Sequence, residues 1–342
     1  MSAQSAITST EFTLRLPESV IVRPTCDVEV TDNKLLLKYA GRQLKLAGPE
    51  TLAGYAFRPL AEGRVLATAN LVPAARDTLT RLACRGLLSD PDQPGAVTGS
   101  EGSAGINTIG CFTDESNRLS EQFPSDGEAN RAAFLSGSHG PEWLPANFLE
   151  QYHFTKSAAF HIEPVLDQPL SSLSRAAWLQ FLADEIPHYR IWRPAFSSFN
   201  WDFEAVQRQI PREPTAWLLE CFRGAAAHSE LAYLGVVMKV EAAPMESHYS
   251  ESEYFTTLMT KYGLPEAAVR PLWWHATENV TAGHSFMPAT LLSEIGPVSA
   301  EQLNEAFWFL RRHYVAIREF NDEMVATFGA STGHLPNLSC RP

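Results

Sequence analysis

The spacing of apolar residues changes along the chain, and its N-terminal part follows the period of two that is typical of half-buried strands. Strands are expected at 19–24, 27–31, 34–39 and 43–47, and helices follow at 49–60 and 72–85. Asp32-Asn33, between the second and third strands, is a tight-turn signal. Residues 12–88 are therefore expected to form a small α+β domain with a winged-helix-like order of elements.

The next segment, 89–132, has little periodicity and is rich in Gly, Ser, Pro and Asp. Its acids outnumber its two bases, Arg118 and Arg131. Such a composition is typical of chain that buries little apolar surface. We therefore predict a flexible acidic linker, with a docking segment around 106–112.

From about residue 133 to 329 the apolar positions follow a helical period of about 3.6 residues. Helices are expected at 142–163, 171–199, 201–210, 214–227, 229–243, 249–262, 265–292 and 299–328. Pro187 falls inside one of them and is expected to bend its axis. Because no repeat of fixed length is visible, the expected architecture is one all-α bundle of about seven helices. Residues 330–342 are expected to be a frayed tail.

Composition and charge narrow the classes of partner. The chain has 342 residues, of which 45% are hydrophobic, and a formal net charge of −12. This charge argues against nucleic-acid binding, which needs a basic surface. No apolar run reaches the ~20 residues of a membrane helix, and the N-terminal residues do not resemble a signal peptide. The five cysteines form no CxxC pair, so we expect a cytoplasmic protein with free thiols and no membrane partner.

Four potential metal ligands, Glu185, His188, Glu241 and His275, lie in stretches that are predicted to be helical. Glu185 and His188 are three residues apart, so both side chains can reach one ion from one helix face. A carboxylate such as Glu241 is costly inside an apolar helix unless it has a partner. Histidines and carboxylates on facing helices are typical of iron that activates dioxygen. Asp184, four residues before His188, is a competing partner for this histidine.

Each candidate ligand also has a purely structural interpretation. Glu185 fits a solvated surface acid, and His188 fits a core histidine bonded to a carbonyl group. Glu241 has a nearby base, Lys239, and His275 lies beside two tryptophans. The metal interpretation is preferred because the four residues recur at suitable intervals.

Two further histidines, His153 and His161, are eight residues apart and therefore lie near one face of a predicted helix. We expect them to line a substrate pocket or to serve a structural role. Cys221 has no motif around it, and we expect a buried thiol there rather than a nucleophile.

The helical region resembles the heme-oxygenase-like diiron oxygenases, which share the fold of thiaminase II and of the pyrroloquinoline-quinone C oxidase. The resemblance rests on EQYHFTKSAAFHIEPVL (150–166), RAAWLQFLADEIPHYRIW (175–192), VVMKVEAAPMES (236–247), KYGLP (261–265) and HATENVTAGHS (275–285). It implies a heme-oxygenase-like bundle in which Glu185, His188, Glu241 and His275 bind iron. It also implies two iron ions, with dioxygen as co-substrate.

The sequence departs from this family in the late helix, which usually runs His-x-x-x-Asp-x-x-His. Here His275 is followed by Asn279 and Ala282 at the corresponding positions. Glu278, Asn279 and His284 are the remaining candidates for the second metal. His284 lies about half a turn away from His275 on an ideal helix, so a bulge at Gly283 would have to turn it inward. A labile second iron, one iron only and no iron all stay open.

The N-terminal unit resembles the pyrroloquinoline-quinone D-like domains, which are also called RiPP recognition elements. The resemblance rests on DNKLLLKYAGRQLKL (32–46) and LTRLACRGLL (79–88). Such domains bind the leader of a ribosomal precursor peptide, which adds as a strand to a sheet edge. The resemblance implies peptide binding at an edge strand within Lys34–Tyr39. A winged-helix unit or a purely structural module is the alternative.

Taken together, the two resemblances imply a non-heme diiron, O2-dependent oxidase or oxygenase that modifies a precursor peptide. The linker would let the peptide reach the bundle while its leader stays bound. Hydroxylation, desaturation and oxidative cleavage remain open as outcomes. The alternatives are a metal-free oxidase like the pyrroloquinoline-quinone C branch and a non-enzymatic peptide carrier. The expected partners are the peptide and, in a homodimer, a second copy of the chain.

Overall fold

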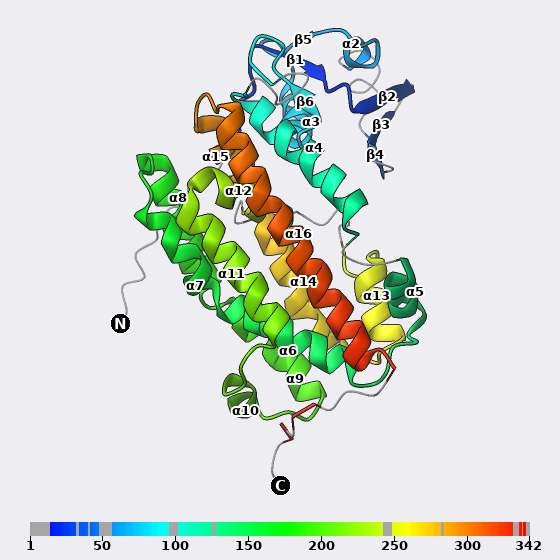
Figure 1. Ribbon diagram of the computed structural model, residues 1–342. Coiled ribbons are helices and arrows are strands. Elements are labelled where there is room, and N and C mark those ends of the chain that lie inside the picture. Colours follow the sequence, from blue (N-terminus) through cyan, green and yellow to red (C-terminus); the bar gives the residue numbers. More distant parts are fainter. Residues whose placement is uncertain are drawn as a thin grey trace, which may run out of the picture. The chain divides into compact units, whose positions relative to one another are not determined.

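The computed structural model describes most of the chain (Figure 1). The described residues are 14–31, 34–39, 42–47, 57–95, 102–124, 128–241, 248–281, 284–330, 335–336 and 338–339. The chain divides into two compact units. The first comprises 1–121, 237–239 and 286–308, and the second comprises 122–236, 240–285 and 309–342. The assignment of separate peptide-binding and catalytic domains to 12–88 and 133–329 stays a prediction.

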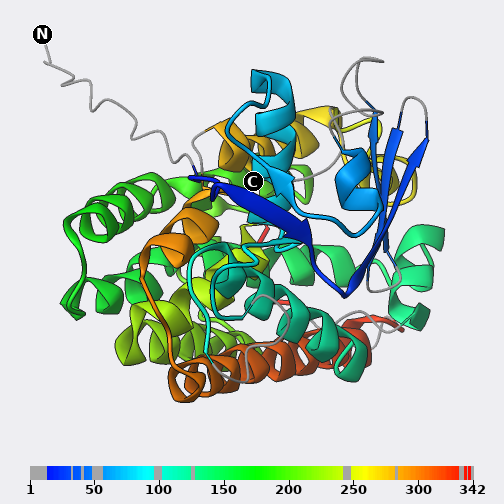
Figure 2. The ribbon, with the colours of Figure 1, turned by 90° about the horizontal axis from the view of Figure 1, so that it is seen from above.

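The described residues of the first unit contain two three-stranded antiparallel sheets. In one, β1 (Ser19–Val22) lies between β5 (Leu66–Ala67) and β6 (Leu88–Ser89). The other contains β2 (Cys26–Thr31), β3 (Lys34–Tyr39) and β4 (Arg42–Ala47), which Figure 2 shows side by side. Two helices follow, α2 (Arg58–Ala61) and α3 (Pro73–Cys84). The prediction of a small α+β region is confirmed, while most of the helix expected at 49–60 falls outside the described residues.

The expectation of an edge strand within Lys34–Tyr39 is wrong. This strand, β3, is the middle strand of its sheet and pairs with β2 on one side and with β4 on the other. In a meander of three strands the middle one uses its backbone groups on both sides, so it offers no free edge to a peptide. Among the described strands, β2 and β4 are the outer ones.

The expectation of a flexible linker at 89–132 is also wrong for most of that segment. Residues Ile106–Gln122 form helix α4, whose first two turns are buried. At its start the buried Asn107 donates hydrogen bonds to the carbonyl groups of Asp90, Gln93 and Pro94. It also accepts one from the backbone N–H of Asp90 at 2.8 Å. A Gly- and Pro-rich stretch is thus held by side-chain bonds that composition does not reveal.

A buried arginine ties β1 to α4 within the first unit. Arg23 is 1% exposed, and its Nη2 lies 2.6 Å from Oδ2 of Asp114. Its Nη1 donates to Ser89 Oγ and to the carbonyl group of Gly95. A charge at this depth is stable only with such partners. Gly110 of α4 leaves the space that the guanidinium group fills.

Helices make up nearly all of the second unit, as predicted. The first helices of this unit, up to the one that ends at the proposed ligand Glu185, are α5 (Glu128–Ser136), α6 (Trp143–Lys156), α7 (Ala158–Ile162), the 3-10 helix η1 (Glu163–Asp167) and α8 (Ser172–Glu185). Then follow the 3-10 helix η2 (His188–Trp192), α9 (Arg193–Ser198), α10 (Phe203–Gln207), α11 (Glu213–His228), α12 (Glu230–Val240), α13 (Glu253–Thr260) and α14 (Glu266–Thr281). The last two helices are α15 (Met287–Glu294), in the first unit, and α16 (Ala300–Phe328), which contributes residues to both.

The structure breaks three of the long predicted helices into shorter ones. The helix expected at 171–199 becomes α8, η2 and α9, because Pro187 lacks the N–H that would continue α8. The Ser171 side chain caps the start of α8 by accepting from the backbone N–H of Ser174. The helices expected at 142–163 and 265–292 are broken as well. Helix α6 packs against η2, which also packs against α14.

A largely aromatic core fills part of the second unit, with Phe148, Tyr152 and Phe196 fully buried. Leu338 joins this core at 3% exposure, and its carbonyl group accepts a hydrogen bond from Asp202 N at 2.7 Å. The expectation of a frayed tail is therefore wrong for this part of 330–342. Burial of one leucine and a backbone bond hold the chain there.

Replacing Gly110 by alanine should lower the free energy of unfolding by about 1–3 kcal/mol, because the new methyl group would overlap the fixed guanidinium group of Arg23. The matched control is Gly224→Ala in α11, where the nearest atom to a new Cβ is Phe309 Cε1 at 3.7 Å. This control should gain roughly 0.5–1 kcal/mol from helix propensity. Urea denaturation measures both, and an unchanged midpoint for Gly110→Ala would show that Arg23 moves aside freely.

Candidate metal centre

The proposed ligands gather where helices end. Glu185 is the last residue of α8, and His188 is the first residue of η2. Glu241 directly follows α12, and His284 lies between α14 and α15. Of these five residues, only His275 lies in the interior of a helix, α14. The packing of η2 against α14 brings His188 next to His275, with ring centroids 4.4 Å apart.

The structure brings Glu185, His188 and His275 together as a first triad. One ligand atom from each residue lies within 4.8 Å of the others. Nδ1 of His188 is 2.9 Å from Oε2 of Glu185. Glu185 and His188 are both buried, while His275 is partly exposed. Two imidazoles and a carboxylate at this spacing can hold one divalent ion of the iron type.

A second triad shares Glu185 and adds Glu241 and His284, again with one ligand atom each within 4.8 Å. Nδ1 of His284 lies 3.3 Å from Oε1 of Glu185, the oxygen that does not face His188. The two oxygens of one carboxylate therefore face two different histidines. Glu185 is therefore the residue that would hold a metal ion in either triad.

His284 enters the second triad because α14 ends at Thr281. The half-turn offset from His275 that an ideal helix would impose therefore does not apply to it. Residues 282–283, where a bulge was expected, fall outside the described residues, as do the side chains of Glu278 and Asn279. Of the three candidates for the second metal, His284 is the one whose place in the cluster the structure describes.

Asp184 has a role that the sequence did not reveal. Its Oδ2 lies 3.1 Å from Nε2 of His284, and its Oδ1 accepts a hydrogen bond from Gln180 at 2.7 Å. A carboxylate that binds one ring nitrogen of a histidine fixes the ring so that the other nitrogen faces a metal. Asp184 was expected to compete with Glu185 for His188. In the structure Glu185 bonds His188, and Asp184 contacts His284 instead. Helix periodicity could not show it, because the two residues are far apart in the chain.

Electrostatics differ sharply between the two glutamates of the cluster. Burial alone would raise the pKa of Glu185, but the hydrogen bond with His188 and the close approach of His284 outweigh burial and lower this pKa to about 2. Burial and the nearby charge of Glu185 raise the pKa of Glu241 to about 8, against the opposing effect of His284. Glu185 therefore favours its ionised form. Glu241 favours its neutral form unless a cation bound nearby stabilises its charge.

The histidines are perturbed in opposite directions. Burial, with the neighbouring His188, lowers the pKa of His275 to about 4, so this ring is neutral and can offer a lone pair. Burial also acts to lower the pKa of His284, but Glu185 and Asp184 outweigh it and raise this pKa. The two neighbouring carboxylates thus favour the protonated form of His284.

Three buried polar atoms of the cluster support the interpretation that it can hold a metal ion. Oε1 of Glu185, Nδ1 of His275 and Nδ1 of His284 have no hydrogen-bond partner of good geometry among the described residues. The 3.3 Å approach of Glu185 and His284 is thus a close contact without hydrogen-bond alignment. Buried polar atoms without partners are rare, and a bound ion is one common reason for them. The donor set of histidines and glutamates fits iron.

The two histidines expected in a substrate pocket lie outside both triads. His161 is buried, and its Nδ1 lies 2.9 Å from the hydroxyl group of Tyr233. Burial lowers its pKa and that of His153 to about 4. Neither lines the cavity of about 650 Å³ in the second unit. Cys221 is a buried thiol whose pKa burial raises, as expected for a structural residue.

No family model matches the sequence, and no curated protein matches it. Among solved structures, the chain is similar to a domain of unknown function with a heme oxygenase-like fold from Shewanella denitrificans. The sequence identity is 14% and the TM-score is 0.48, over 66% of this chain and 95% of that chain. A likeness this distant fixes neither the family nor the activity. Every helix in the described residues is too short or too polar to cross a membrane.

Metal analysis after anaerobic loading with ferrous iron tests the cluster. Glu185→Ala should lose iron from both triads because they share this residue, whereas Glu241→Ala should lose iron from only one. The control is Glu230→Gln, a partly buried glutamate that accepts a hydrogen bond from Trp178 outside the cluster, and it should keep the wild-type content. Equal iron in wild type and Glu241→Ala would remove Glu241 from the ligand set.

Proposed function

We propose that this chain is an iron- and O2-dependent oxidase or oxygenase of the heme-oxygenase-like diiron type. The observation that carries the proposal is the pair of triads that share Glu185. Ferrous ions bound there would supply the electrons that activate dioxygen. Each triad offers three protein ligand atoms, which leaves coordination positions for oxygen and substrate.

The residues of the chain have distinct roles in this proposal. Glu185 would contribute to both metal sites, His188 and His275 would complete one, and Glu241 and His284 would complete the other. Asp184 holds the ring of His284 in position through Nε2. The ring of Phe181 meets His284 edge-on, with centroids 5.0 Å apart, and keeps water from that side.

We propose a ribosomal precursor peptide as the substrate, in line with the resemblance of residues 32–46 and 79–88 to peptide-binding domains. Because β3 has no free edge, its leader would add as a strand beside β2 or β4, the outer strands of the sheet. Helix α2 packs against β2 and could supply side chains to such a peptide. Holding the leader would raise the local concentration of the segment to be modified.

Oxygen uptake tests the iron-dependent activity. Wild-type protein loaded anaerobically with ferrous iron should consume oxygen and oxidise its iron faster than free iron in the same buffer. Glu185→Ala should fall to the rate of free iron, and Glu230→Gln should match wild type. Oxygen electrode and visible absorption traces measure this. Equal oxygen uptake by metal-free and loaded protein in the presence of substrate would instead favour a metal-free oxidase.

Hydrogen exchange tests the leader site. Synthetic copies of short peptides encoded beside the gene are added to the full chain, and amide exchange is followed by mass spectrometry. A bound leader should slow exchange at β2 or β4, because a new strand occupies their outer backbone groups. Helix α11 serves as the internal control and should be unchanged. Binding of a peptide without protection of either strand would contradict strand addition.

A further inference from the structure

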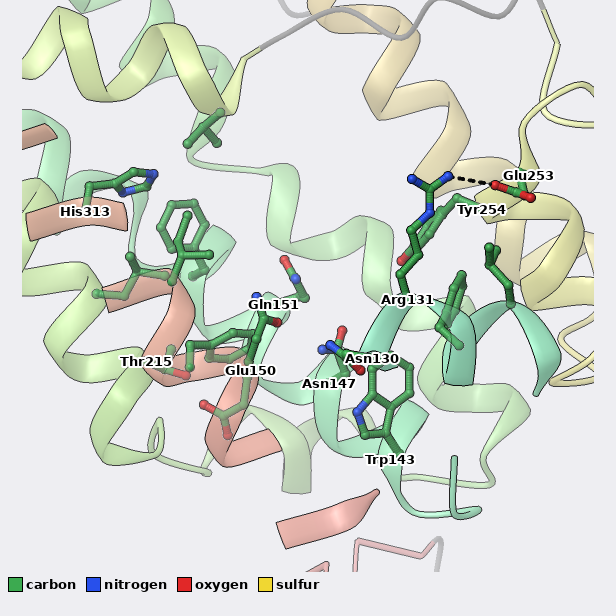
Figure 3. Close-up of a pocket in the computed structure, with 18 of the residues that line it drawn as sticks. Asn130, Arg131, Trp143, Asn147, Glu150, Gln151, Thr215, Glu253, Tyr254 and His313 are labelled. Atoms are coloured by element: carbon green, nitrogen blue, oxygen red, sulfur yellow. Dashed lines mark hydrogen bonds and ion pairs between the residues drawn. The ribbon is translucent and has the colours of Figure 1, made fainter. Parts of the chain in front are cut away.

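A cavity of about 650 Å³ opens within the second unit, apart from the metal candidates (Figure 3). Its size falls within the ~300–1,000 Å³ that holds ligands of drug-like size. Helices α5, α6, α11, α13 and α16 supply most of its walls. None of the five cluster residues lines it.

Three buried polar atoms in the cavity wall have no hydrogen-bond partner among the described residues: Trp143 Nε1, Thr215 Oγ1 and Asn130 Oδ1. Trp143 and Thr215 are 7% and 1% exposed. Thr215 lies close enough to Glu150 to lower the pKa of this acid, but without an aligned hydrogen bond. Buried polar atoms left in this state cost free energy that a ligand can recover.

These atoms define the hydrogen-bonding character of a ligand. Trp143 Nε1 only donates, Asn130 Oδ1 only accepts, and the Thr215 hydroxyl does both. A group that carries a donor and an acceptor at once satisfies such a set. The secondary amide of a peptide backbone is the most common group of this kind.

The cavity carries little uncompensated charge. Among the lining residues, Arg131 pairs with Glu253 at 3.0 Å, and both side chains are mostly exposed (Figure 3). Glu150 is 2% exposed and accepts a hydrogen bond from the backbone N–H of Arg212. Burial raises the pKa of Glu150 and so favours its neutral form, against smaller effects of Thr215 and Arg212. A charged ligand would lose its hydration without gaining a partner of opposite charge.

Aromatic rings give the cavity an apolar side. Phe134 stacks on Tyr254 with ring centroids 5.3 Å apart, and both line the wall. Phe154 and Phe222 line it as well, and each ring lies 5.3 Å from the ring of His161. An aromatic or branched side chain would bury apolar surface against these rings.

We propose that this cavity binds a neutral peptide segment through its backbone amides and one aromatic or branched side chain. The inference deepens the proposed function by giving the segment to be modified a binding cavity, and it rests on that function only for the oxidation, not for the binding. Val240, in the cavity wall, directly precedes Glu241. His161, behind Phe154 and Phe222, bonds Tyr233, whose pKa burial and the charges of Glu241 and Glu185 raise. The cavity wall is thus linked to the cluster directly through Val240 and indirectly through His161 and Tyr233.

Calorimetric titration of the metal-free full-length protein tests the binding. The probe is N-acetyl-phenylalanine amide, and the comparison probe is N-acetyl-phenylalanine with a free carboxylate. The amide should bind saturably, and the acid should bind at least tenfold more weakly. Thr215→Val and Trp143→Phe each remove one polar atom while keeping size or ring, and each should weaken amide binding roughly three- to tenfold.

The matched control is Thr290→Val, because Thr290 in α15 is also buried with an unpartnered Oγ1 but lies outside the cavity. It should leave the affinity unchanged. Absence of saturable binding, equal binding of amide and acid, or wild-type affinity in both cavity variants would each overturn the proposal. Iron plays no part in this titration. Amide binding without iron-dependent oxygen uptake would therefore support the cavity and reject the proposed activity, and the reverse result would do the opposite.

Discussion

The buried carboxylate of Glu185 is the constraint on which the candidate metal centre depends. A carboxylate removed from water stays ionised only if groups on every side compensate its charge. His188 approaches one of its oxygens and His284 the other. The remaining members, His275 and Glu241, then fall into two overlapping groups around this one residue. The same carboxylate thus organises both halves of the cluster and links them.

Helix ends explain how such a cluster can form. Within a regular helix, neighbouring side chains are fixed at 100° steps, which limits how many can converge on one point. This limit does not apply to four of the cluster residues, because each lies at or beyond the end of a helix: Glu185, His188, Glu241 and His284. Pro187 makes one of these breaks directly. Elsewhere in the unit, Phe154 and Phe222 belong to the cavity wall and contact His161, which lies outside both triads.

Much of the fold follows from local patterns. Alternation predicted β1 to β4, and the period of 3.6 predicted the order of the helices in the second unit. Helix α4 was not predicted because its apolar face comes directly after a Gly- and Pro-rich stretch. It is fixed by hydrogen bonds of its own Asn107 to that stretch and by Arg23, which lies far away in the chain. The middle position of β3 in its sheet was not predicted either, since alternation indicates the two faces of a strand and not which strands pair with it.

For the candidate site, the sequence by itself determined which residues could bind a metal, because acids and histidines inside apolar helices are costly without a purpose. It left open whether they meet, and it favoured a helix that would have turned His284 away. The tertiary structure decided the grouping into two triads, the contact of Asp184 with His284, and the cavity with its unpartnered polar atoms. These features depend on where helices end and on which distant segments pack together, and neither is encoded in local periodicity.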